Sequence, residues 1–127
     1  MKHNALCQLR DIYNAIRLFE EEFSKRYNLS LNEAMLLCTL SHERNPVCKD
    51  LSEKLALTPS NLSKVIKSAE DKELIKRMLM AKDKRQMCFS LSEKGKEKLS
   101  EMKTAESEIE NLLNKIVYLF SKDTANI

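Results

Sequence analysis

The spacing of apolar residues changes along this chain, and that change limits the fold more than any other feature of the sequence. Residues 4–27 and 99–120 place apolar side chains every three or four positions, as one face of an amphipathic helix requires. Met87, Phe89 and Leu91 alternate instead with smaller side chains, which is typical of a half-buried strand. One Gly and two Pro among 127 residues leave little room for loops. The sequence therefore predicts a mainly α fold with a small β-hairpin.

The boundaries of the predicted elements follow from capping and breaking residues. Asn45-Pro46 ends a helix, because the residue before Pro resists the α conformation. Thr58 is a preferred N-cap, and Pro59 suits the first helical position, where no backbone N–H is needed. In chain order we expect helices at 4–27, 31–43, 48–55, 59–72 and 93–120, with the hairpin formed by strands at 75–80 and 87–91.

A short helix, a tight turn and a capped second helix form a helix-turn-helix, and a hairpin that follows forms a wing. We therefore interpret residues 1–127 as a single winged helix-turn-helix domain, with a DNA-binding winged segment at 47–98. The charge distribution fits this assignment, since residues 47–98 carry a net charge of +5 and the rest of the chain −2. A basic central segment suits a polyanionic partner.

The second helix of this unit would present a polar face to the major groove. Its core face centres on Leu62 and Ile66, and the opposite face carries small hydroxyls, an amide and two lysines. Such side chains suit base edges and phosphates, although an ordinary solvated helix face would have the same composition. The candidate DNA-binding residues on this helix are Ser60, Asn61, Ser63, Lys64 and Lys67.

The tip of the predicted hairpin is also basic. Lys82, Lys84 and Arg85 could reach the neighbouring minor groove or its phosphates, or they could belong to a solvated turn. Asp83 would be an unusual DNA contact, so we expect its carboxylate to brace Arg85 through a charge-assisted hydrogen bond.

Four motifs carry a family resemblance. They are LALTPSNLSKVI at 55–66, LIKR at 74–77, DKR at 83–85 and LSEKG at 91–95. In this order and spacing they resemble the turn and recognition helix, the wing entry, the wing motif and the following helix start of the MarR family. The resemblance implies a homodimeric transcriptional regulator that binds a pseudo-palindromic operator in double-stranded DNA and is released by a small ligand or an oxidant. It could be a repressor or an activator, and we expect a repressor. Glu73 departs from the pattern, because the family usually has Gly there, so the helix end is in question.

The terminal helices are the predicted dimerisation elements, at 4–27 and 99–121. A helix from 93 to 120 would be about 42 Å long, which a domain this small cannot cover by itself. Burial of both apolar stripes against a second chain would give a two-fold interface. The predicted interface residues are Leu9, Ile12, Ile16, Ile109, Leu112, Ile116 and Phe120.

The four cysteines are expected to be free thiols, since none forms a C-x-x-C pair. Cys7, near the start of the first helix, could sense oxidants as in some MarR-type relatives, or it could be a plain interface residue. Cys38 lies in an apolar run and is expected in the core. Cys88 is expected to point away from the apolar face of its strand, where oxidation could affect the wing.

Several classes of protein are disfavoured by what the sequence lacks. It has no Gly-rich loop and no Ser/His/Asp set, so we expect no enzyme and no cofactor. Two histidines and the cysteine spacing predict no metal site. The absence of a long apolar run and of a signal peptide predicts a cytoplasmic protein without a membrane span. The alternative function is a winged-helix protein-interaction module whose basic face contacts an acidic partner instead of DNA.

Overall fold

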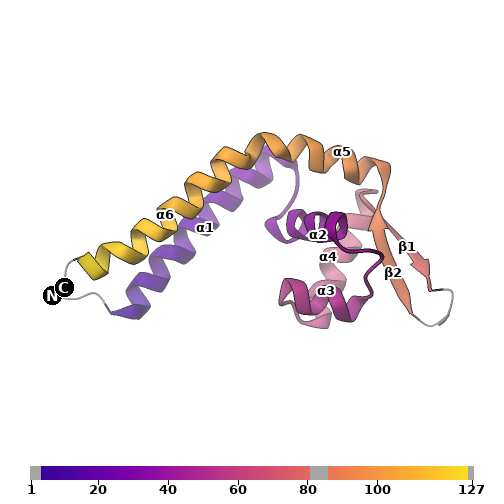
Figure 1. Cartoon of the computed structure of the whole chain (residues 1–127), viewed down its shortest axis with the longest axis horizontal. Coiled ribbons are helices and arrows are strands. Elements are labelled where there is room, and N and C mark those ends of the chain that lie inside the picture. Colours follow the sequence, from indigo (N-terminus) through magenta and orange to yellow (C-terminus); the bar gives the residue numbers. More distant parts are fainter. Residues whose placement is uncertain (1–3, 81–85, 126–127) are drawn as a thin grey trace. The chain divides into compact units, whose positions relative to one another are not determined.

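The computed structural model describes residues 4–80 and 86–125, which form two compact units (Figure 1). The two-helix unit combines residues up to Asn28 with those from Lys103 onward, and the winged-helix unit is Leu29–Met102. The described elements are α1 (Ala5–Tyr27), α2 (Leu31–His42), α3 (Cys48–Leu55), α4 (Pro59–Asp71), β1 (Ile75–Leu79), β2 (Met87–Leu91), α5 (Glu93–Met102), the 3₁₀ turn η1 (Lys103–Ala105) and α6 (Glu106–Ala125). This is the mainly α architecture with a β-hairpin that the sequence predicts.

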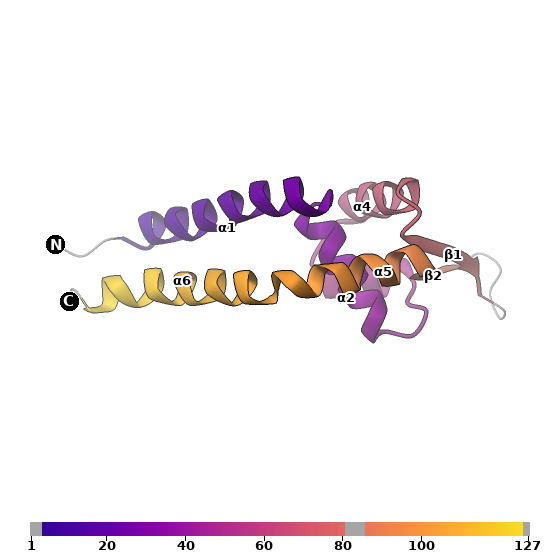
Figure 2. The ribbon, with the colours of Figure 1, turned by 90° about the horizontal axis from the view of Figure 1, so that it is seen from above.

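In the two-helix unit, α1 and α6 lie side by side along their length (Figures 1 and 2). Polar contacts join them near both ends: Gln8 donates to the Phe120 carbonyl at 2.8 Å, and Arg26 pairs with Glu108. Asn4 caps the start of α1, accepting from the Cys7 N–H at 2.9 Å. The two residues of each interhelical contact lie more than 80 positions apart in the sequence, so the pairing joins two distant segments of the chain.

The last helical region differs from the continuous helix predicted for 93–120. A 3₁₀ turn, η1, separates α5 from α6. Ala105 in this turn is fully buried. The hydroxyl groups of Thr104 and Tyr27 form a hydrogen bond of 2.9 Å. An i, i+3 apolar spacing fits a 3₁₀ turn as well as an α-helix, so the periodicity of the sequence does not reveal the interruption.

The winged-helix unit is built around α2, which packs against α3, α4, α5 and β2. The apolar side chains that meet at its centre are almost fully excluded from solvent, and Leu36, Leu37, Leu51 and Phe89 are among them. The opposite face of α2 is exposed, and it carries Cys38. The prediction that Cys38 belongs to the core is therefore wrong. Because cysteine is weakly apolar, it can continue an apolar run in the sequence and still lie on the exposed face of a helix.

The wing is an antiparallel hairpin in which Ile75 pairs with Leu91 and Leu79 with Met87. Val47, ahead of α3, bridges to Cys88 from the other side of β2. Cys88 is consequently flanked by Met78 on one side and Val47 on the other, and it is buried. Alternation along β2 still places Cys88 on the opposite face from Phe89 and Leu91, as predicted. A period of two does not show that this face is buried as well, so Cys88 is not an accessible thiol.

The only glycine of the sequence fixes the junction between the wing and α5. A Cβ atom at Gly95 would lie 2.0 Å from the backbone oxygen of Leu74, much closer than any real contact. The same oxygen accepts from the Ser92 N–H at 3.1 Å, and the Ser92 hydroxyl donates to the Glu73 carbonyl at 2.6 Å. The LSEKG motif therefore holds the start of α5 against the end of α4.

Candidate nucleic-acid interface

The turn before α4 is fixed by its own backbone. Ala56 adopts the left-handed conformation with φ 53°, and the Leu57 N–H donates to Ser52 at 3.1 Å. Thr58 then caps α4, accepting from the Asn61 N–H at 3.2 Å, and Pro59 takes the first helical position. This is the N-terminus that the Thr-Pro pair predicts, and it places the first turn of α4 on the surface.

The two faces of α4 differ sharply in exposure. Leu62, Ile66 and Ala69 are buried, with exposed fractions of 2%, 3% and 0%. The five residues of α4 that were predicted to contact DNA are all exposed, which is the arrangement that a recognition helix needs. They are Ser60, Asn61, Ser63, Lys64 and Lys67. Their contact with DNA stays a prediction.

The cations on this face are available to an anionic partner. Lys67 lies 3.8 Å from Asp71 in an exposed pair, which contributes little to stability. Lys64 forms no ion pair within residues 4–80 and 86–125. Neither lysine would have to break a strong contact before binding a phosphate.

Both flanks of α4 carry charged contacts that the sequence reasoning missed. On one flank, Glu33 of α2 is the only buried charged residue in the described part of the chain, and it contacts Ser68 and Lys72. On the other flank, Glu70 accepts two hydrogen bonds from Arg77 of β1, each 2.7 Å long. The S-x-x-E pattern of Ser30 and Glu33 was a readable signal, since it forms the capping box at the start of α2.

The pKa values of both carboxyls reflect these contacts. Burial alone would raise the pKa of Glu33, but hydrogen bonds from the Ser30 N–H, Lys72 and Ser68 outweigh it and hold that pKa below its ordinary value. The pKa of Glu70 is lowered chiefly by its hydrogen bonds from Arg77. Both carboxylates are therefore stabilised in their charged form.

The end of α4 resolves the question raised by Glu73. This residue takes the left-handed conformation, with φ 62°, that Gly supplies elsewhere. The Glu73 N–H donates to the backbone carbonyl of Glu70 at 2.9 Å, and the Leu74 N–H donates to that of Ala69 at 3.0 Å. These two bonds form the Schellman motif. The helix therefore ends in the usual geometry without glycine, at the energetic cost of a strained non-Gly residue.

Both strands of the wing, β1 and β2, belong to the described structure. Next to the tip of the hairpin, the Met80 N–H donates to the Gln86 carbonyl at 3.0 Å. The predicted contacts Lys82, Lys84 and Arg85, and the brace Asp83, lie outside the described residues. Their roles stay predictions.

The predicted dimer residues fall into two groups. Leu9, Ile16 and Phe120 are exposed. The others are half-buried within the chain, in the unit where α1 packs against α6, and they are Ile12, Ile109, Leu112 and Ile116. The structure adds exposed apolar residues beside the first group that the prediction left out, namely Leu6, Tyr13, Leu113 and Val117.

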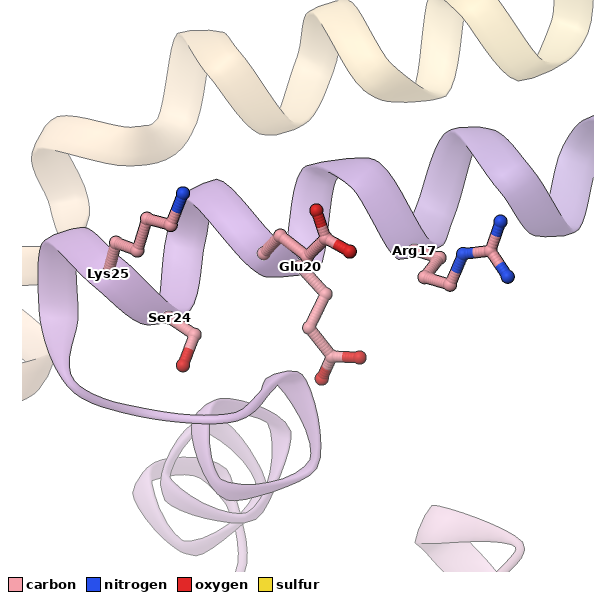
Figure 3. A pocket seen from close by; sticks show the side chains of 5 residues that line it. Arg17, Glu20, Ser24 and Lys25 are labelled. Atoms are coloured by element: carbon pink, nitrogen blue, oxygen red, sulfur yellow. The ribbon is translucent and has the colours of Figure 1, made fainter.

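One hollow on the surface lies along α1 and is lined by charged and polar side chains (Figure 3). Arg17, Glu20, Ser24 and Lys25 mark it, and their mixed charges favour no particular ligand. Within the described residues, no three potential metal-ligand side chains lie together. No helix there is long and apolar enough to cross a membrane.

A helix-turn-helix followed immediately by a two-stranded wing defines the class of winged helix-turn-helix proteins. This chain belongs to the family of transcriptional regulator SarA/Rot, whose model matches residues 18–102. It is accordingly a transcriptional regulator. No curated protein matches the sequence.

Solved structures of MarR-type regulators share the fold, which confirms the resemblance drawn from the motifs. The chain is similar to MepR of S. aureus in a complex with DNA, with 18% identity, coverage of 90% of this chain and 85% of that one, and a TM-score of 0.80. It is also similar to BldR of Sulfolobus solfataricus, with 21% identity, coverage of 96% and 93%, and a TM-score of 0.75. For the adhesin competence repressor AdcR of Streptococcus pyogenes the identity is 23%, the coverage 91% and 82%, and the TM-score 0.70.

Proposed function

We propose that this regulator binds double-stranded DNA sequence-specifically, as a homodimer on a pseudo-palindromic operator. The observation that carries the proposal is the exposed face of α4, which presents hydroxyls, an amide and lysines directly after a capped turn. A helix with this face fits the major groove, where polar side chains read base edges. The similar MepR structure is a complex with DNA, which supports the same use of the fold.

The residues on α4 would contact different parts of the DNA, depending on their position along the helix. Ser60, Asn61, Ser63 and Lys64 lie in its first half, which is the part of a recognition helix that usually contacts bases. Lys67, a turn further along, suits a phosphate. In the wing, Lys82, Lys84 and Arg85 would follow the neighbouring groove, with Asp83 bracing Arg85.

The homodimer is supported by apolar surface on the two-helix unit. On α1 the exposed residues Leu9 and Ile16 belong to one stripe, and on α6 Leu113 and Val117 belong to another. Contiguous exposed apolar surface of this kind usually marks an interaction site. A second copy of the chain would bury it in a two-fold interface and set the separation of the two recognition helices.

The regulator would act in the cytoplasm as a repressor, with release from DNA by a small effector molecule. A reporter placed behind the operator tests the direction of regulation, since deletion of the regulator should raise its expression. Unchanged or lower expression would contradict repression.

The DNA-binding face is tested by titrating duplex DNA, selected from random sequence, at several salt concentrations. Replacing Lys64 and Lys67 together with Ala should weaken binding and lower the salt slope by about one unit for each lost phosphate contact. The fold should survive, because neither side chain lies on the buried face of α4.

A matched control removes two cations from the other unit. Lys25 lies 3.8 Å from Glu22, as Lys67 does from Asp71, and Lys115 is exposed like Lys64. The Lys25→Ala/Lys115→Ala variant should keep the slope of the wild type. Equal salt slopes for all three proteins would contradict the assignment of Lys64 and Lys67 to DNA binding. If the wild-type protein does not bind DNA, the alternative function is favoured, in which the basic face binds an acidic protein partner.

A further inference from the structure

We propose that two charged contacts, one on each flank of α4, fix the rotation of this helix about its own axis and so determine which side chains face DNA. The contacts are Glu33 with Ser68 and Lys72, and Arg77 with Glu70. This inference rests on the proposed function, and it assigns positioning roles to Glu33 and Arg77, neither of which lies on the exposed face of α4.

The first flank is held from α2. One oxygen of Glu33 accepts from the Ser68 hydroxyl at 2.8 Å. The other accepts from Lys72 at 2.9 Å and from the Ser30 N–H at 2.9 Å. Glu33 is 4% exposed, so these bonds form away from water, where a hydrogen bond is electrostatically stronger. Glu33 thereby joins the start of α2 to two positions one turn apart on α4.

The second flank is held from β1. Arg77 donates from Nε and Nη2 to the two oxygens of Glu70, both at 2.7 Å. A guanidinium that binds a carboxylate through two bonds fixes orientation as well as distance. The Arg77 guanidinium also lies 5.5 Å from the centre of the Phe89 ring, which ties this contact to the core of the wing.

The helical positions of these contacts explain why they would control rotation. Successive residues of a helix turn by about 100°, so Ser68 and Lys72 lie on one side of the buried face and Glu70 on the other. The exposed face with Ser60 and Lys64 lies between the two flanks, opposite the core. Any rotation of α4 that changes its presentation to DNA would have to lengthen one contact or the other.

The buried apolar residues of α4 cannot supply this control alone. Leu62, Ile66 and Ala69 are held by a hydrophobic effect that has no direction, so small rotations would change their burial little. Neither contact is expected to add much stability, because the Glu33 pair is buried and the Arg77–Glu70 pair is partly exposed. What the charged contacts add is a defined register, and register decides which bases a recognition helix reads.

The test compares discrimination between DNA sequences in three variants: Glu33→Gln, Glu70→Gln and the double variant. Each removes charge from one flank or both while keeping the size of the side chain. The measured quantity is the ratio of affinities for the selected site and for a scrambled duplex of equal length and composition. We expect each single variant to lower this ratio about fivefold, since mismatched contacts at one position cost a comparable amount.

The double variant separates positioning from stability. The two contacts share no residue, so their effects on unfolding free energy should add. The discrimination ratio should fall by clearly more than the product of the two single effects, because either contact alone still limits rotation. A purely multiplicative loss of discrimination, or no loss, would overturn the proposal.

Two controls complete the design. Glu97→Gln removes the same charge from an exposed position on α5 and should leave the ratio unchanged. If Glu33→Gln fails to fold, Ser68→Ala breaks one bond of the same flank from α4 without a change of charge, and it should lower the ratio about threefold. Wild-type protein with no preference for the selected site would refute the proposed function, whereas wild-type preference retained in every variant would refute this inference alone.

Discussion

The two units of this regulator bury their apolar residues to very different degrees. In the described part of the chain, nine large apolar side chains are exposed in the two-helix unit, against three in the winged-helix unit. The winged-helix unit packs four elements against α2 and has a core of its own. The two-helix unit packs one face of α1 on α6 and leaves other apolar faces uncovered. One unit is thus folded to present a polar helix, and the other to present an apolar surface.

The largest effect should follow from a charge in the apolar surface of α6. Val117 is 64% exposed, so Val117→Glu should leave the chain folded and prevent association of two copies. Operator affinity should fall by a factor of about 100 or more, because a monomer binds one half-site without the help of the second. Light scattering and DNA titration at micromolar protein concentration measure the two effects.

The control for this variant is Glu110→Lys, an exposed charge reversal on the same helix, which should change neither the mass nor the affinity. Leu112→Glu offers a contrast, since Leu112 is half-buried in the unit where α1 packs on α6. That variant should unfold the two-helix unit as well as dissociate it, with loss of helical circular dichroism. A wild-type protein that is monomeric at micromolar concentration would contradict the interface altogether.

In the winged-helix unit the largest effect should come from Gly95→Ala. The added methyl group would lie 2.0 Å from the Leu74 backbone oxygen, and no side-chain movement can relieve a clash with backbone. We expect the free energy of unfolding to fall by about 3 kcal/mol, as for severe overpacking. Urea denaturation measures it, and Ser100→Ala at an exposed position of α5 is the control. A change below about 1 kcal/mol would show that α5 shifts freely relative to the wing.

The sequence predicted those elements whose signals are local. Thr58 and Pro59 marked the start of α4, and alternating residues marked β2, so both were located correctly. The polar face of α4 was also predictable, because a helix of known start and a fixed turn per residue places every side chain. Gly95 was noticed as part of a motif, although its reason, contact with the Leu74 carbonyl, requires the folded chain.

What the sequence could not supply depends on contacts between distant segments. Val47 pairs with Cys88 on the side of β2 away from β1, and Lys72 and Ser68 bind the buried carboxylate of Glu33. Neither partner follows from periodicity. The predicted dimer stripe on α6 likewise combined residues of different exposure, since Leu112 is half-buried while Phe120 is exposed.

A moderate effect should appear in acid. The pKa of Glu33 is lower in the folded chain than its ordinary value, so the unfolded chain binds protons first as the pH falls. The stabilisation by Glu33 is therefore complete above its unfolded pKa and disappears as the pH falls through its folded pKa. Between pH 7 and pH 3, Glu33→Gln should lose less unfolding free energy than the wild type. Parallel pH profiles would contradict this account, and Glu97→Gln should follow the wild type.

The smallest effect distinguishes strain from function at the end of α4. Glu73 has φ 62°, a conformation that costs free energy for any residue with a Cβ atom, and its side chain is exposed. Glu73→Gly should therefore stabilise the winged-helix unit by about 0.5–1 kcal/mol, after the greater flexibility of Gly in the unfolded chain is included. The matched control is Glu97→Gly within α5, where the same substitution should destabilise by about 1 kcal/mol because a helix interior disfavours Gly. If the left-handed backbone is the cause, thermal unfolding should show changes in unfolding free energy of opposite sign for the two variants. A destabilised Glu73→Gly variant would instead show that the Glu73 side chain makes a stabilising contact at the junction with the wing.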